Sequence, residues 1–170
     1  MKDKGFARAL AAIDEAAGAL DVAAIARPVS GRWSIAEILE HLTLAFKANA
    51  VALEKPLVSG ELRARKPDLK QRFFRTLVIR FGYFPRVEAP EVTRPSGTIP
   101  PERSLAALRD ALTTLDAMLT RVAARFGEDV PVTNHPYFAG LTVRQWRAFH
   151  CRHTLHHMQQ VRERARYQSA

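Results

Sequence analysis

Four of the six histidines of the chain fall within eight residues, at His150, His153, His156 and His157. On a helix that turns 100° per residue, His153 and His157 lie one turn apart on one face, the spacing by which two imidazoles reach a single ion. His150 lies two turns from His157, about 10 Å along the axis, and His156 lies further round the helix. The pair His153 and His157 is therefore the candidate for metal ligation.

A third ligand must come from another element, because two imidazoles alone bind a metal weakly. His41 is the candidate, since it lies within a predicted helix among Ile38, Leu42 and Ala45 and so points inward. Three protein ligands with open positions are typical of a catalytic rather than a structural metal site. The spacing alone leaves two other interpretations open: a hydrogen-bonded core histidine at 41, and a solvated or pH-sensitive histidine face.

Two other potential ligands have simpler roles. Glu37 lies one turn before His41, but with Ser34 it forms the Ser-x-x-Glu pattern of a helix capping box. Cys151, the one cysteine, lies about 160° from His153 around the helix, so we expect a small buried side chain there. A single cysteine forms no internal disulfide, which fits a reducing compartment.

Four segments have the apolar periodicity of amphipathic helices, and no segment has the strong alternation of a strand. We expect helices at about 4–20, 34–54, 100–126 and 142–164. The connection 57–100 is too long for a plain turn between bundle helices. The expected fold is all-α: a four-helix bundle with one long crossover connection.

Helix ends carry further signals. Thr142 followed by Gln145 is a second capping box, at the start of the last helix. Pro56 is expected to stop the second helix near Glu54, and Gly127 is placed to end the third helix in a left-handed cap. The apolar stripe of the third helix is Leu105, Leu108, Leu112, Leu115, Leu119 and Val122, and that of the first is Phe6, Leu10, Ile13 and Ala17.

We expect one domain over 1–170, with an irregular basic insertion at about 57–100. Within the insertion, 68–81 is predicted to be a short basic helix. Its aromatic residues could stack nucleic-acid bases. Phe73, Leu77 and Phe81 share one helical face, however, which favours packing on the bundle instead.

The formal net charge of +9 is concentrated in two stretches. Residues 61–86 hold eight Lys/Arg against two acids, a net of +6, and residues 142–166 hold six Arg against one Glu, a net of +5. Such stretches can meet phosphate, an anionic membrane surface or an acidic ligand. A solvated basic face is the simpler interpretation, and we favour it.

No apolar run approaches the roughly 20 residues of a membrane-spanning helix. The N-terminal segment is amphipathic and contains Asp14 and Glu15, unlike a secretory signal. The expected location is therefore cytoplasmic, with no membrane partner.

Three motifs resemble those of DinB-like proteins. They are WSIAEILEHL at 33–42, HTLHHMQQ at 153–160, which is similar to an HxxHHxxQ motif, and HPYFAGLT at 135–142, which resembles a loop in an uncharacterised branch of that superfamily. The resemblance implies a four-helix bundle with one divalent metal ion, zinc or nickel. By position, its ligands are His41, His153 and His157, the three histidines that the spacing also selects.

The relatives include bacterial thiol S-transferases and a thiol-dependent isomerase, which favours a metal-dependent transferase that uses a small-molecule thiol. A metal-dependent hydrolase and a non-enzymatic metal- or ligand-binding module are the alternatives. His135, on the loop before the last helix, is the candidate acid/base or substrate contact, and Gln160 is the candidate to orient a ligand. The expected partners are a small-molecule substrate and a second copy of the chain in a homodimer; nucleic acid is not expected.

Overall fold

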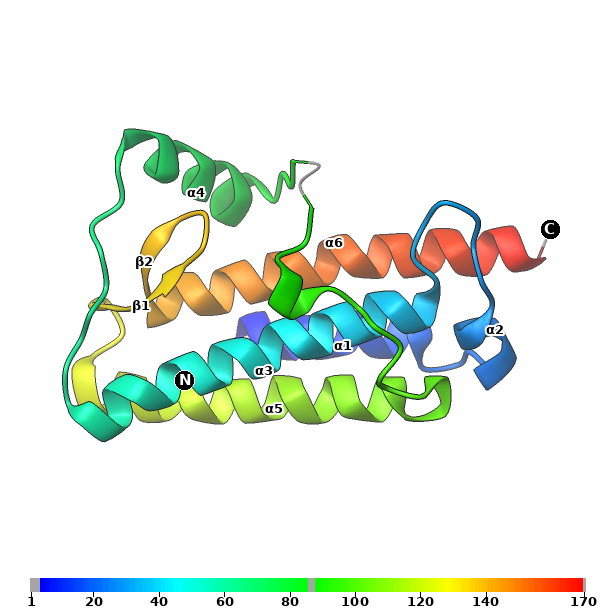
Figure 1. Ribbon diagram of the computed structural model, residues 1–170, viewed down its shortest axis with the longest axis horizontal. Coiled ribbons are helices and arrows are strands. Elements are labelled where there is room, and N and C mark those ends of the chain that lie inside the picture. The colour runs from blue at the N-terminus through cyan, green and yellow to red at the C-terminus, as the bar shows by residue number, and fades with distance from the viewer. Residues whose placement is uncertain (1–3, 86–87, 170) are drawn as a thin grey trace.

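The computed structural model describes residues 4–85 and 88–169, and four long helices form the predicted bundle (Figure 1). Residues 1–3 and Arg86, which the charge count included, lie outside the described residues. The elements in chain order are α1 (Lys4–Ala17), α2 (Val22–Ala26), α3 (Ile35–Ser59), α4 (Leu69–Phe81), the 3-10 turn η1 (Glu91–Thr93), α5 (Pro101–Phe126), β1 (Pro131–His135), β2 (Ala139–Thr142) and α6 (Val143–Ser169).

The long crossover sets the direction of the helices. Figure 1 shows α3 and α5 running the same way, with α1 and α6 running opposite to them. α3 packs mainly on α5, and α1 packs mainly on α6. Parallel neighbours need a connection that returns along the bundle, and the chain between α3 and α5 does this.

The core is built from the predicted stripes, with two exceptions. The α5 stripe from Leu108 to Val122 is buried, but Leu105 at its start is only partly buried. In α1, Phe6 and Ile13 are buried, whereas Leu10 is 39% exposed and belongs to the outer face. Ala9 and Ala16 occupy the inner face instead, where small side chains allow α1 to approach the bundle.

Three predictions about helix ends are wrong. α6 runs to Ser169 rather than to residue 164. α3 continues past Pro56 to Ser59, because a proline in the last turn removes only one backbone bond. Gly60 N–H bonds to the Pro56 carbonyl, and the Arg125 guanidinium donates to the Leu57 carbonyl. Gly127 ends α5 with φ 89° and ψ 163°, so it is not a left-handed helical cap.

A short antiparallel hairpin, β1–β2, precedes α6 and was not predicted. It has few residues and includes prolines and a glycine, so no alternating pattern is visible. Asn134 accepts from the Arg65 N–H and donates to the Arg63 carbonyl, and the Gly140 N–H donates to the Arg65 carbonyl. A Cβ at Gly140 would lie 2.7 Å from that carbonyl oxygen, so the close approach needs glycine. The hairpin thus holds the segment that leads into α4.

The basic helix α4 lies outside the four-helix bundle, beside the hairpin (Figure 1). Its start is a capping box between Asp68 and Gln71. It turns Phe74 and Val78 toward the protein, and α6 supports its end through Arg152, which donates to the Arg80 carbonyl. The expectation that Phe73 and Phe81 pack on the bundle is wrong: they are 64% and 67% exposed.

Candidate metal centre

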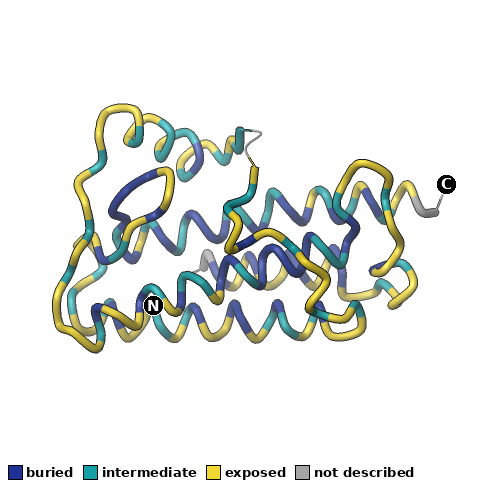
Figure 2. The backbone as a smooth tube through the Cα atoms, viewed as in Figure 1, coloured by how far each residue is buried: buried dark blue, intermediate teal, exposed yellow. Residues whose placement is uncertain are grey.

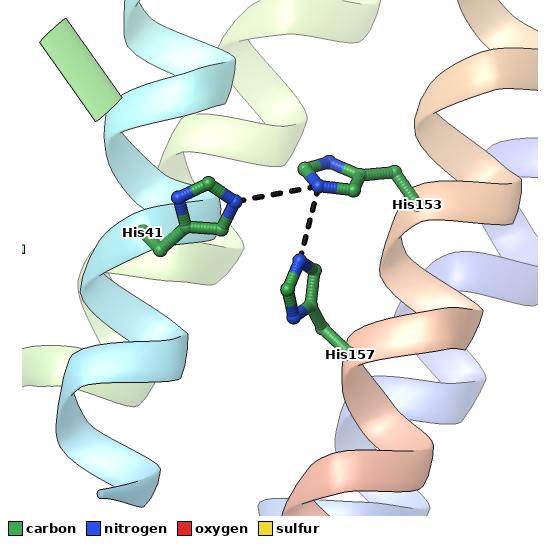
Figure 3. A group of neighbouring side chains, drawn as sticks. All are labelled: His41, His153 and His157. Carbon is green, nitrogen blue, oxygen red and sulfur yellow. Dashed lines mark hydrogen bonds between the residues drawn. The ribbon is translucent and has the colours of Figure 1, made fainter. Parts of the chain in front are cut away.

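Three imidazoles converge between α3 and α6 (Figure 3). His153 Nε2 lies 3.3 Å from His41 Nε2 and 3.0 Å from His157 Nε2. One ligand atom of each lies within 4.8 Å of the others. We call His41, His153 and His157 the histidine triad. Among the residues that the structure describes, no further Cys, His, Asp or Glu joins this group.

The spacing of these nitrogens suits one metal ion. With metal–nitrogen bonds of about 2.0–2.1 Å, two imidazole nitrogens on a tetrahedral ion lie roughly 3.3 Å apart. The separations of His153 Nε2 from His41 Nε2 and from His157 Nε2 are close to this value. The triad is therefore positioned to hold an ion, as the sequence predicted.

The crossover fixes the orientation of His41. Its Nδ1 lies 2.7 Å from the carbonyl oxygen of Thr93 in η1. Because a carbonyl only accepts, Nδ1 carries the proton in this bond. Nε2 of the neutral ring is then unprotonated, and its lone pair faces the triad.

Gln160 fixes His157 in the same way. His157 Nδ1 lies 2.9 Å from Gln160 Oε1, so Nδ1 donates and Nε2 keeps its lone pair. The amide nitrogen of Gln160 lies 3.3 Å from His156 Nε2, which agrees with this orientation of the amide. His156 itself stacks on Phe84, with ring centroids 4.9 Å apart, and does not join the triad. A metal-ligating histidine is expected to donate a hydrogen bond from its other ring nitrogen, as His157 does to Gln160.

His153 completes the fit. Its Nδ1 is buried and has no hydrogen-bond partner among the described residues. If Nε2 of His153 carries a proton, it can donate to Nε2 of His41 or to Nε2 of His157, but not to both. The other lone pair then has no partner. An ion accepts all three lone pairs, so the donor set suits a cation better than any pattern of protons. His153 is also the one triad member that is partly rather than fully buried.

Aromatic rings surround the triad and exclude water from most of it. Trp33 lies 5.0 Å from the His41 ring, while Phe84 and Phe149 stack on His153 at 5.6 and 5.4 Å between centroids. Burial lowers the pKa of His157 to about 3, helped by repulsion from His41. Burial also lowers the pKa of His41, against the raising effect of its bond to Thr93. Neutral imidazole, the metal-binding form, is therefore favoured.

Glu40 anchors the crossover and was not identified from the sequence. Its carboxylate accepts from the Gly97 N–H at 2.9 Å, the Thr98 N–H at 3.0 Å and the Thr98 hydroxyl at 2.7 Å. Burial opposes ionisation of Glu40, but these bonds outweigh it and lower the pKa of the carboxyl. A signal was present in the sequence: Glu40 lies next to His41 on the inward face of the predicted helix. A buried carboxylate needs hydrogen-bond donors around it.

Glu37 and Cys151 have the expected local roles. Glu37 Oε2 accepts from the Ser34 N–H and hydroxyl at 2.7 and 2.8 Å, which completes the capping box. The second predicted box, between Thr142 and Gln145, is also formed. Cys151 is buried and outside the triad, so the described chain brings no thiol to the centre.

His135 lies at the end of β1, apart from the triad. Its ring stacks on Phe138 at 4.2 Å, and its Nδ1 accepts from the Tyr137 N–H. Phe149 contacts both His135 and His153, at 4.6 and 5.4 Å between centroids, and so lies between them. Burial lowers the pKa of His135 to about 3. Its catalytic role stays a prediction.

Comparison with protein families gives a match over most of the chain. The model of the DinB superfamily matches residues 6–161, which include the triad, Gln160 and the crossover. No curated protein and no solved structure matches the chain.

Proposed function

Since the chain belongs to the DinB superfamily, we propose that it is a metal-dependent enzyme whose histidine triad binds one divalent ion and whose substrate includes a small-molecule thiol. The observation that carries the proposal is the fixed tautomer of His41 and His157. Thr93 and Gln160 hold the Nδ1 protons, so the lone pairs of both rings point at His153. Imidazole nitrogen ligands suit zinc or nickel.

A divalent ion held by three imidazoles supplies Lewis-acid chemistry, which lowers the pKa of a thiol or water at its open position. Aromatic residues of the chain would enclose an ion held by the triad. Trp33 covers His41, and Phe84 with Phe149 covers His153. These rings reduce the local dielectric, which strengthens electrostatic interactions at the centre.

A thiol is a better candidate than water for activation. A hydrolase needs a base within hydrogen-bond reach of the attacking water. Phe149 separates His135 from His153, and the low pKa of His135 makes it a weak base. A thiol of low intrinsic pKa needs less help from a base. The sulfur belongs to a substrate, since Cys151 is outside the triad.

Elemental analysis of the protein purified without an affinity tag tests the metal. One zinc or nickel ion per chain is the expected result. Absence of stoichiometric metal, together with no uptake of zinc, nickel or cobalt by the metal-free protein, would refute the proposal.

Titration of the cobalt-substituted protein with several small thiols tests the substrate class. We expect a change in the visible spectrum, because sulfur is a good ligand for a borderline-soft ion. The matched control is His156→Ala, which removes a neighbouring imidazole outside the triad. No spectral change with any thiol, alongside slow ester hydrolysis that is lost in His135→Ala, would favour the hydrolase. Silence in both assays would favour a non-enzymatic binding module.

A further inference from the structure

The outer face of α4 is apolar although nothing in the described chain covers it. Leu69, Phe73, Leu77 and Phe81 recur every four residues and so form one stripe along the helix. Leu69, Phe73 and Phe81 are 81%, 64% and 67% exposed, and Leu77 is partly exposed. Figure 2 shows this helix apart from the bundle, with exposed residues along it. We call these four residues the outer stripe.

Basic side chains lie within and beside the outer stripe. Lys70, Arg72 and Arg80 are exposed on the same helix, and Arg65 and Lys66 are exposed in the segment before it. Within the described part of the chain, no acidic side chain forms an ion pair with any of these five. Burial and repulsion from Arg72 lower the pKa of Arg75, the cation one turn along. The positive charge here is therefore crowded and uncompensated.

The other basic stretch, 142–166, differs in this respect. Arg144 pairs with Glu128 and Asp129, and Arg147 pairs with Asp116. Further along α6, Arg162 pairs with Glu15. These arginines join helices within the protein. By contrast, five neighbouring cations without an ion pair to a described acidic side chain lie together on α4 and the segment before it.

In place of the expectation from the sequence that there is no membrane partner, we propose that α4 docks on an anionic lipid surface, lying in the plane of the membrane with the outer stripe inserted among the acyl chains. Phenylalanine and leucine beside lysine and arginine on one short helix are the features of an interfacial helix. Anionic lipid headgroups would attract the lysine and arginine side chains, and the acyl region would bury the apolar side chains of the outer stripe. The described helices include none with the length and apolarity to cross a membrane. That finding does not bear on this surface, since an interfacial helix does not span.

Two other occupants fit less well. A second copy of the chain docked through α4 would bring the same cations face to face, which is unfavourable. Single-stranded nucleic acid would match the charge, but it binds aromatic side chains along a groove, whereas the outer stripe lies on the exposed side of a helix outside the bundle (Figure 1).

Co-sedimentation of the full-length protein with vesicles tests the proposal. We expect binding to vesicles of phosphatidylcholine with phosphatidylglycerol, weak binding to phosphatidylcholine alone, and loss of binding at high salt. Phe73→Ser with Phe81→Ser should reduce the partition coefficient by at least about tenfold. Lys70→Gln with Arg72→Gln should reduce it by about 30-fold on the anionic vesicles, since each cation contributes roughly fivefold.

The matched controls are Val58→Ser and Arg103→Gln, which remove an exposed apolar and an exposed basic side chain elsewhere. Both should bind as the wild type does, and thermal melts should show that all variants are folded. Failure of the wild type to bind anionic vesicles would overturn the proposal, as would equal binding by the α4 variants. Binding to a single-stranded oligonucleotide that the α4 substitutions abolish, without binding to vesicles, would assign the surface to nucleic acid instead.

Discussion

His150 should make the metal-free protein sensitive to acid, and replacing it with leucine should remove a defined part of that sensitivity. Its side chain is fully buried, and neither ring nitrogen has a hydrogen-bond partner among the described residues. It stacks on Trp146 and contacts Phe46 and Phe149. Burial, helped by repulsion from His135, lowers the pKa of His150 to about 3.

The sign follows from the two pKa values. Above the unfolded value of about 6.5, His150 is neutral in both states and does not change the stability with pH. Between pH 6.5 and 3, the unfolded chain binds a proton that the folded protein excludes, so the free energy of unfolding falls as the pH falls. The slope is about 1.4 kcal/mol per pH unit for this one residue, which amounts to about 2 kcal/mol between pH 7 and pH 5.

Urea unfolding of the metal-free protein at pH 7 and pH 5 measures this effect. His150→Leu should lose about 2 kcal/mol less stability than the wild type between the two conditions. Any packing cost of the substitution is independent of pH and cancels in the comparison. Phe46→Leu is the matched control, because it alters the same contact without removing a titrating group. An equal pH dependence in His150→Leu and the wild type would refute the reasoning.

Three further predictions concern the metal centre and are checked by titrating the metal-free variants with zinc or cobalt. Alanine at any member of the histidine triad should abolish stoichiometric binding, whereas His156→Ala should retain it; the reverse pattern would refute the assignment of ligands. Gln160→Leu should weaken binding by roughly 10- to 100-fold, because the bond that fixes His157 is lost, and Gln160→Glu should restore most of it. Glu40→Gln should cost about 1–3 kcal/mol of stability and also weaken metal binding, because it loosens the crossover that carries Thr93. Unchanged affinity in Glu40→Gln would show that the crossover does not position His41.

The bundle helices and the triad could be predicted because their signals are local. Helical periodicity and two capping boxes locate α3 and α6, and the i, i+4 spacing selects His153 and His157. The inward position of His41 on its predicted helix added the third ligand, and the resemblance to DinB-like motifs selected the same residue. Each of these patterns involves residues only a few positions apart, so it can be recognised without knowing the fold.

The partner of His41 could not be predicted, because it comes from a segment without periodicity. The carbonyl of Thr93 is a backbone group, and no residue type at that position indicates it. The inner face of α4 is Phe74 and Val78 rather than Phe73 and Phe81, because the helix has apolar residues on two faces and the pattern alone does not choose between them. The hairpin is too short for its alternation to be recognised.

The hydrogen bond between His41 and Thr93 links metal binding to the position of the crossover. While the crossover is docked, the His41 proton stays on Nδ1; once it undocks, the proton is free to move to Nε2, the nitrogen that faces the triad. Apparent metal affinity then scales with the fraction of molecules whose crossover is docked. The hydrogen bonds that Glu40 accepts from Gly97 and Thr98 favour the docked crossover, and they therefore favour metal binding.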